Sequence, residues 1–404
     1  MFDIRLLFQK NNNRYQSKIG FLNNKNKQKL LLFKENQPIF QLTSFNKLIP
    51  FLTTVSTGLY KGFPIVIDLS KTVFADKLTY ILLECLCYSE LNNNPKRKIS
   101  VLINQKTEIV TNGLTVSPLQ ILRSSTTKER NAFFIKKFIK DYSPGHYRKV
   151  IFQKDVSDDK PIVSSLMQDI ESFLKFQVIS PEYISAVSEV ISELVDNALE
   201  HTSADCLVDI DITPKTFKKL LNEDEKIYSD DNFFGVNVVI LNFSESLIGE
   251  KLKEKITNID LHLLDEKDRY LYVSNALNNQ RQKFSQDYFE DDFFAIASYQ
   301  HKISSRKNTK LGGTGLTTLL NSLEQKSDAY HCYMISGNRV LWFNHDYLNY
   351  NEDGWIGFNK NNDFFNDKPD SNCFEKTSFF FPGTAYNLNF IVKQENHNGG
   401  KANG

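Results

Sequence analysis

Three polar residues, Glu193, Asn197 and His201, follow one another at intervals of four in a stretch with helical periodicity. Residues four apart lie one above another on a helix, so an acid, an amide and a histidine would share one face. An amide oxygen such as that of Asn197 suits Mg²⁺, a hard cation that keeps several waters and binds phosphates. Glu193, one turn earlier, would be placed to take the proton of an attacking water. The alternative is that all three are surface residues of an ordinary amphipathic helix.

A second stretch suited to chemistry is the glycine-rich segment 311–316, more than a hundred residues later. Gly312, Gly313 and Gly315 allow positive φ angles and a close approach of the backbone to a ligand. A helix starting there would present its first amide groups to phosphate. Glycine-rich turns at helix starts also occur for packing alone, so this segment by itself is weak evidence. The two stretches together predict a nucleotide site.

A long helix must carry the first stretch. From Pro181 to His201, apolar residues recur at steps of three and four and predict one face in a core; they are Ile184, Val187, Ile191, Leu194 and Ala198. The patterns around it predict helices at 163–176 and 314–323 and strands at 206–213, 235–242, 329–336, 339–343 and 384–392. This order predicts an α+β domain over residues 160–395.

The first part of the chain has a different pattern. Buried strands at 63–69 and 98–103 flank an amphipathic helix at 76–90, which predicts a βαβ unit within a smaller α/β domain at 61–145. Residues 1–60 are expected to be strand-rich or irregular. Turn signals between residues 141 and 165 predict the domain boundary, and residues 396–404 are expected to be a disordered tail.

Composition excludes several classes of protein. Forty-nine basic and 48 acidic residues give a formal net charge of +1, so no overall field favours nucleic acid or acidic membranes, although a local basic patch is possible. No apolar run approaches the ~20 residues that span a bilayer, and we expect a soluble, cytoplasmic protein. Five cysteines without paired CxxC spacing are expected to be reduced core thiols; they are Cys85, Cys87, Cys206, Cys332 and Cys373.

Residues 193–202, Glu-Leu-Val-Asp-Asn-Ala-Leu-Glu-His-Thr, resemble the N-box of the GHKL ATPase superfamily, which includes gyrase, Hsp-type chaperones, MutL and the histidine kinases. The resemblance runs from about 182 to 392. It implies a Bergerat-type α/β sandwich, with a mixed sheet and helices on one face, that binds ATP and Mg²⁺. It assigns Glu193 as the water-activating base, Asn197 as the magnesium ligand, and His201 and Thr202 as neighbours of the nucleotide.

The same resemblance extends to later motifs. Its phosphate-cradling glycine box corresponds to Gly312, Gly313, Thr314, Gly315 and Leu316, and its terminal GT corresponds to Gly383 and Thr384, with Thr384 near adenine. The family's mobile lid corresponds to residues 250–311. Just ahead of the glycines, Arg306, Lys307 and Lys310 are candidates for phosphate contacts, the alternative for each being a solvated basic loop.

One motif departs from the family pattern. Where the family has DxGxG, this chain has Asn242 in place of the adenine-reading aspartate and Ser244 in place of a glycine. An asparagine oxygen still accepts from an adenine amino group, but a charge-assisted bond is about twice as strong. Adenine affinity or selectivity is therefore expected to be altered. The alternative is a degenerate nucleotide site kept as scaffold.

Residues 62–131 resemble a STAS-like domain, the fold of anti-anti-sigma proteins, in which a strand of the type Ile-Val-Ile-Asp-Leu-Ser precedes a helix. That family often offers a phosphorylatable serine at the start of the helix. Here residues 74–77 read Phe-Ala-Asp-Lys, so a phosphoswitch is not expected at this point.

These observations predict a magnesium-dependent, ATP-binding and ATP-hydrolysing conformational switch in a signalling, regulatory or defence pathway, with a protein partner or self-association. One alternative is an anti-sigma-type serine kinase acting on a separate protein. Another is a non-hydrolysing, nucleotide-sensing interaction module that uses the aromatic-rich insertion at 341–381, whose aromatics equally fit a core of their own. His146 lies in a Ser-Pro-Gly-His turn, which disfavours a histidine kinase. No gyrase-like transducer domain is expected after the last strand.

Overall fold

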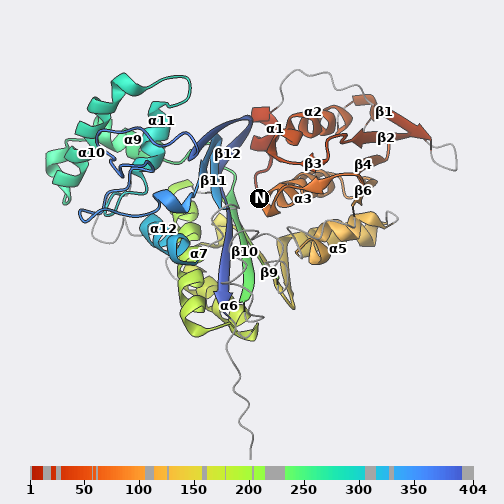
Figure 1. The fold of residues 1–404 in the computed structure, drawn as a ribbon. Coiled ribbons are helices and arrows are strands. Elements are labelled where there is room, and N and C mark those ends of the chain that lie inside the picture. The colour runs from red at the N-terminus through yellow and green to blue at the C-terminus, as the bar shows by residue number, and fades with distance from the viewer. Residues whose placement is uncertain are drawn as a thin grey trace, which may run out of the picture.

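A six-stranded antiparallel sheet lies at the centre of the chain, and different parts of the sequence cover its two faces (Figure 1). The computed structural model describes residues 2–11, 20–23, 29–56, 58–60, 62–104, 113–124, 127–156, 162–177, 179–202, 204–213, 233–304, 315–326 and 332–393. The strands run in the order β11-β12-β10-β9-β8-β7. Their bounds are β7 Lys140–Ser143, β8 His146–Ile151, β9 Cys206–Thr213, β10 Phe233–Asn242, β11 Tyr333–Trp342 and β12 Phe374–Lys393.

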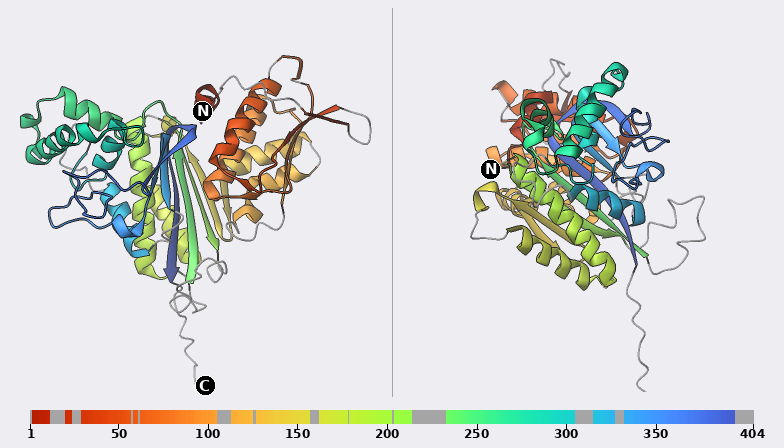
Figure 2. Two further views of the ribbon diagram at one scale, coloured as in Figure 1. Left: turned by 45° about the horizontal axis from the view of Figure 1, so that its top comes forward. Right: turned by 90° about the vertical axis from the view of Figure 1, so that its left-hand side faces the viewer.

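Three helices cover one face of this sheet, namely α6 (Ile162–Phe176), α7 (Pro181–Thr202) and α12 (Gly315–Lys326). Strand β9 shows why they pack there. Its alternate residues Val208, Ile210 and Ile212 point to these helices, because successive side chains of a strand point to opposite faces. The apolar stripe predicted for α7 enters the same core. The figures show α7 crossing this face (Figure 2).

The other face is covered by an N-terminal α/β unit, formed by residues 2–139. Its sheet has the order β1-β2-β4-β6, in which β4 pairs in parallel with β2 and with β6. The bounds are β1 Gly20–Asn23, β2 Lys29–Lys34, β3 Ile39–Phe40, β4 Ile65–Leu69, β5 Val73–Phe74, β6 Ile99–Ile103, α1 Arg5–Asn11, α2 Phe45–Ser56, α3 Lys77–Asn93, α4 Gly113–Val116 and α5 Lys128–Ile139. Leu207, Val239 and Leu241 of the large sheet share one hydrophobic core with this unit.

A helical lobe projects from the edge of the large sheet at β11. It contains α9 (Glu250–Asn258), α10 (Lys267–Gln280) and α11 (Glu290–Ala297), packed against the segment 343–373. Trp355 stacks between Tyr272 and Phe364, with ring centroids 4.2 and 5.8 Å away. Arg269 lies over the Trp355 ring at 3.9 Å. Most aromatic residues of the predicted insertion therefore form the lobe's own core.

The predicted α+β class is confirmed, and so is the β4-α3-β6 unit with its parallel pairing. The predicted mixed central sheet is wrong, because all of its neighbouring strands are antiparallel and the parallel pairs lie in the N-terminal unit. The β7-β8 hairpin, at residues 140–151, also pairs with β9. The large sheet thus starts ahead of the boundary expected between residues 145 and 160.

Residues 1–60 hold more helix than expected. The sequence pattern did not predict helix α2, because Pro50 stands in its interior, where proline normally breaks a helix. The tail at 396–404 lies outside the described residues. The five cysteines are free thiols and all are buried, as predicted. Among the described residues, no helix is both long and apolar enough to cross a membrane.

Candidate nucleotide site and a buried charge network

Helix α7 carries the predicted catalytic face. Glu193 and Asn197 are both partly buried on it, one turn apart, while Ile191, Leu194 and Val195 are buried in the core. The amide of Asn197 makes no hydrogen bond with any described residue. Of His201, only the helical backbone is described. Two of the three residues predicted to share this face are therefore placed as expected.

Helix α12 packs against α7 and brings the end of the glycine-rich segment beside it. Gly315 is the first residue of α12, and Leu316 packs partly buried against the same hydrophobic core as α7. The remaining residues predicted for phosphate contact lie outside the described part of the chain; they are Arg306, Lys307, Lys310, Gly312, Gly313 and Thr314. Of this segment, Gly315 and Leu316 thus belong to a helix that packs against the helix carrying Asn197.

Three of the residues predicted near the nucleotide lie where α7, β10 and β12 come together; they are Thr202, Asn242 and Thr384. Asn242, the last residue of β10, lies opposite Thr384 of β12 in the strand register. Its Nδ2 donates to Thr202 Oγ1 at 2.9 Å, and that hydroxyl donates to the carbonyl of Ala198 at 2.5 Å. Asn242 is buried, and in this orientation its Oδ1 has no hydrogen-bond partner among the described residues. The hydrogen bond to Thr202 therefore fixes the orientation of the Asn242 amide and leaves its Oδ1 as the acceptor without a partner among the described residues.

Ser336 of β11 was not predicted as a site residue, but its hydroxyl connects the loop after β10 to β12. Its Oγ donates to the Gly383 carbonyl at 2.7 Å and accepts from the Ile248 amide at 3.0 Å. Thr384 Oγ1 lies 3.5 Å from the same hydroxyl. The loop that follows Asn242 is thereby attached to β12. No spacing pattern marks Ser336 in the sequence, because its role depends on strands that are distant along the chain.

Gly383 allows β12 to approach the end of β10. Its φ is +98°, and a Cβ there would meet the carbonyl oxygen of Asn242 and lie 2.9 Å from the Ser244 amide nitrogen. A side chain would therefore be strained and would push the two strands apart. The close approach of β12 to β10 therefore explains why position 383 of the predicted GT motif is glycine, whether or not a ligand binds.

A cavity of about 660 Å³ adjoins this site. Thr202 and Ala204 line it from the end of α7, and Ser244 and Ser246 line it from the loop after β10. Asp3 and Leu6 of the N-terminal unit also line it, as do Gln153, Lys154, Asp205, Phe243, Glu245 and Lys251. The N-terminal unit therefore reaches the same cavity as two segments of the candidate site.

The side chains fit a magnesium nucleotide. Asn197 offers an amide oxygen that has no partner among the described residues, and Asn242 offers a second such acceptor. Among the described residues, no group of three or more His, Cys, Asp and Glu side chains is arranged to hold a metal. A magnesium ion that takes most of its ligands from phosphates and water requires no such group.

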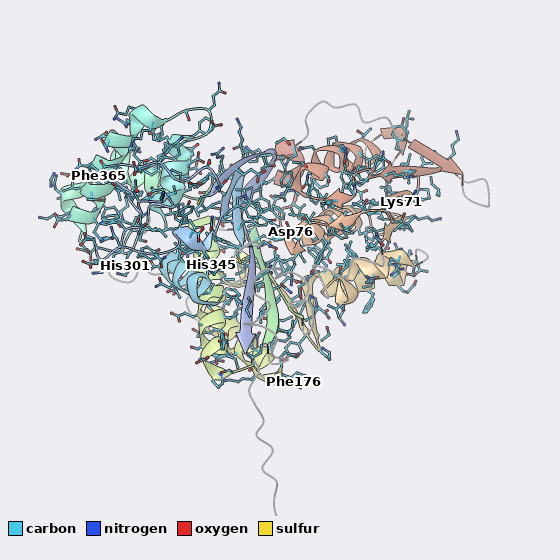
Figure 3. All side chains as sticks on the ribbon, in the orientation of Figure 1. Lys71, Asp76, Phe176, His301, His345 and Phe365 are labelled. Carbon is cyan, nitrogen blue, oxygen red and sulfur yellow. The ribbon has the colours of Figure 1, made fainter. Side chains whose placement is uncertain are left out.

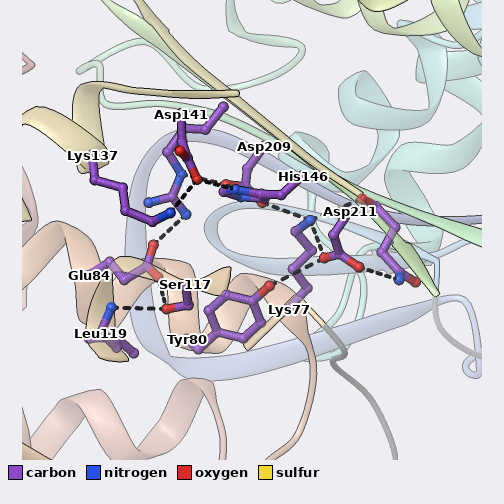
Figure 4. A network of polar contacts seen from close by, with 12 residues as sticks. Lys77, Tyr80, Glu84, Ser117, Leu119, Lys137, Asp141, His146, Asp209 and Asp211 are labelled. Atoms are coloured by element: carbon purple, nitrogen blue, oxygen red, sulfur yellow. Dashed lines mark hydrogen bonds and ion pairs between the residues drawn. The ribbon is translucent and has the colours of Figure 1, made fainter. Parts of the chain in front are cut away.

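A buried network of charges joins α3 to the other face of the large sheet (Figure 4). Lys77, the first residue of α3, places its Nζ 2.7 Å from Asp209 Oδ1 and 2.5 Å from Asp211 Oδ2 on β9. Arg148 of β8 pairs with Asp209 and, at 2.5 Å, with Glu84 of α3. These five side chains are at most 2% exposed.

His146 completes this network. Its Nδ1 lies 2.7 Å from Asp141 Oδ2, and its Nε2 lies 3.0 Å from Asp209 Oδ2. Both ring nitrogens face carboxylates, so both must carry protons for the contacts to be hydrogen bonds. Burial opposes the charge, but Asp209 and the hydrogen bonds to Asp141 and Asp209 outweigh it and raise the pKa of His146. The two contacts and the raised pKa favour the charged form of His146, which is buried at the start of β8 directly after the predicted Ser-Pro-Gly turn.

The charges of the network balance. Four basic groups, Lys77, Lys137, His146 and Arg148, face four acidic groups, Glu84, Asp141, Asp209 and Asp211. Burial opposes the charge of Asp209, but Arg148, Lys77 and His146 together hold its pKa well below the usual value. Burial raises the pKa of Glu84 despite its contact with Arg148. Charges buried to this degree require partners, since an unpaired one would be very costly. The network thus fixes α3 to the sheet.

Asp76 stands directly before α3, in the segment where the sequence resemblance predicted a serine in related domains. Its Oδ1 accepts from the Thr79 amide at 2.8 Å and caps α3, and its Oδ2 accepts from the Tyr333 hydroxyl at 2.8 Å. Both oxygens are therefore used in holding the N-terminal unit to β11. Figure 3 shows Asp76 at this junction.

The chain matches no family model, no curated protein and no solved structure.

Proposed function

We propose that the protein is a magnesium-dependent, ATP-hydrolysing conformational switch of the GHKL type. The observation that carries this proposal is the meeting of Thr202, Asn242 and Thr384 beside the helix that bears Glu193 and Asn197. These three residues come from α7, β10 and β12, which are separate elements along the chain. In the sequence alone, only their residue types and their order connected them.

Each residue would have a separate task. Asn242 Oδ1 would accept from the adenine amino group, in the orientation that Thr202 sets. The amide oxygen of Asn197 would hold Mg²⁺, which would neutralise phosphate charge. Glu193 would accept a proton from the attacking water, since it lies one turn from Asn197 on the same helix. The amides at the start of α12 would contact phosphate.

The connections of the site support a switch. The loop that follows Asn242 leads directly into α9 of the helical lobe and is attached to β12 through Ser336. Asp3 and Leu6 of the N-terminal unit line the adjoining cavity. A shift of this loop when nucleotide binds would therefore reach both the lobe and the N-terminal unit.

Calorimetry and phosphate release test this proposal. We expect the purified protein to bind magnesium-ATP, Asn197→Ala to abolish binding, and Glu193→Ala to bind ATP without turnover. Glu189→Ala is the matched control, because this exposed acid lies on the same helix outside the site. It should behave as the unmodified protein does.

The other outcomes separate the alternatives. No binding at millimolar ATP would contradict the proposal and leave an interaction module. Transfer of labelled phosphate to another protein, without release of free phosphate, would instead indicate a serine kinase. Binding that is unaffected by Asn197→Ala would place the nucleotide elsewhere on the molecule.

A further inference from the structure

An open groove lies on the outer side of the N-terminal unit, between α5 and the loop that joins α3 to β6. Its volume is about 930 Å³. The residues that line it are Asn93, Asn94, Pro95, Lys96, Lys128, Ala132, Ile135, Lys136 and Ile139. Figure 1 shows α5 in the N-terminal unit, across the large sheet from the helical lobe, and the groove shares no lining residue with the cavity beside the candidate nucleotide site.

The groove has a local positive charge. Lys96, Lys128 and Lys136 are exposed, and none of them forms an ion pair with a described residue. Among the described residues that line the groove, none is acidic. In a chain whose basic and acidic residues nearly cancel, 49 against 48, three unpaired lysines around one groove attract an anionic partner.

The same groove has an aliphatic floor. Pro95, Ala132, Ile135 and Ile139 contribute apolar surface to it. Ile135 and Ile139 also pack against the core beneath, which holds them in place. On the neighbouring surface of α5, Phe133 is 57% exposed. Burial of aliphatic side chains against this surface would stabilise a complex in addition to the attraction between charges.

Hydrogen bonds hold the two walls together. Asn131 of α5 donates from Nδ2 to the carbonyls of Pro95 and Arg97, at 2.8 and 3.0 Å. Arg130 donates from Nη2 to the Ile99 carbonyl at 2.7 Å. The groove is thus formed before any partner arrives, which lowers the entropy that binding would cost.

We propose that this groove binds an acidic, amphipathic segment of a partner protein. Carboxylates of the segment pair with Lys96, Lys128 and Lys136, and its aliphatic side chains contact Ile135 and Ile139, in the manner of a helix in a groove. A nucleic acid is a poorer fit. Its phosphates would meet the lysines, but the described residues of the lining include no arginine and no aromatic ring on which bases would stack.

The test uses the full chain and three probes in fluorescence anisotropy. The first probe is a synthetic peptide with Glu and Leu on opposite helical faces. The second has Ser in place of Leu, and the third is a single-stranded oligonucleotide. We expect the Glu/Leu peptide to bind best, and its affinity to fall as salt rises, because screening weakens exposed charges.

Three variants locate the binding. The combined change Lys96→Glu, Lys128→Glu and Lys136→Glu should weaken the Glu/Leu peptide about tenfold or more, since attraction becomes repulsion. Ala132→Glu, at an exposed position on the floor, should weaken it as well. The matched control reverses three exposed lysines outside the groove, Lys71, Lys360 and Lys368, and should leave binding unchanged. Thermal unfolding verifies that every variant is folded.

Three results would overturn the proposal. One is equal binding of the Glu/Ser and Glu/Leu peptides, which would remove the role of the aliphatic floor. Another is equal loss of affinity in the groove variant and the control variant. The third is tighter binding of the oligonucleotide with the same sensitivity to the groove variant, which would assign this surface to nucleic acid.

Discussion

Individual polar residues of this protein fall into two groups. In the buried network, the charged groups of Lys77, Arg148 and His146 are held against carboxylates. At the candidate nucleotide site, the amide of Asn197 and Oδ1 of Asn242 have no partner among the described residues. Buried or partly buried polar groups are normally hydrogen-bonded, so unused ones are a reason to look for a ligand. The first group therefore supports the fold, and the second supports a function.

His146 gives a prediction for pH. Its raised pKa means that its contribution to stability is complete below the ordinary histidine value of about 6.5 and disappears as the pH rises through the raised value. We expect His146→Gln to destabilise the protein most at low pH and progressively less as the pH increases. Urea unfolding of both proteins between about pH 5.5 and 9 measures this difference.

The comparison reports on His146 together with the two carboxylates that it contacts, because His146 helps to lower the pKa values of Asp141 and Asp209. The raised pKa of Glu84, which is not caused by His146, is common to both proteins. A destabilisation that does not change with pH would show that His146 is not a cation in the folded protein.

Whole elements meet at the candidate site because their backbones approach closely. Strand β12 passes the end of β10 at Gly383, and Gly249 directly precedes α9 at a point where a Cβ would lie 2.6 Å from the carbonyl carbon of Phe294. Both glycines have positive φ angles. The register that places Asn242 opposite Thr384 therefore depends on a position that tolerates no side chain.

Gly383→Ala tests this dependence. The added methyl group meets backbone atoms of Asn242 and Ser244, so we expect a loss of about 1–3 kcal/mol of stability, as in overpacked cores, together with weaker nucleotide binding. Gly62→Ala is the control, because no atom lies within 4 Å of the added carbon and its φ is not positive. Unfolding curves and calorimetry measure the two effects. Equal stability of the two variants would show that the strands can separate without cost.

At the scale of the whole molecule, the N-terminal unit and the large sheet share one hydrophobic core and one charge network. We expect them to unfold together, in a single calorimetric transition. Lys77→Met should lower its stability by about 3–5 kcal/mol, because it leaves Asp209 and Asp211 without one of their buried cations.

Lys175→Met is the control for that prediction. Lys175 forms an exposed pair with Glu171 on α6, at 3.5 Å, and its loss should change stability little. Differential scanning calorimetry compares the three proteins. Two separate transitions in the unmodified protein would contradict a shared core, and equal effects of the two variants would contradict the role of the network.

The sequence by itself determined the local elements and the chemistry that they offer. Periodicity located α7, β9 and β10 to within two residues, because a helix or strand that buries one face repeats its apolar residues at fixed steps. The residue types and spacing of Glu193, Asn197 and His201, together with the glycine-rich segment 311–316, predicted a nucleotide site before any contact was known. The helix α2 was missed, since Pro50 contradicts its local pattern.

Only the tertiary structure determined which polar side chains of distant elements contact one another. The alternating acids Asp209 and Asp211 are a pattern that normally marks a solvent-exposed face, yet α3 buries them with Lys77. His146 and Ser336 acquired their partners from strands that are distant in sequence. The groove beside α5 combines a loop and a helix more than thirty residues apart. Periodicity reports which face of an element is apolar, but the partner of a polar face is a long-range contact that local sequence does not encode.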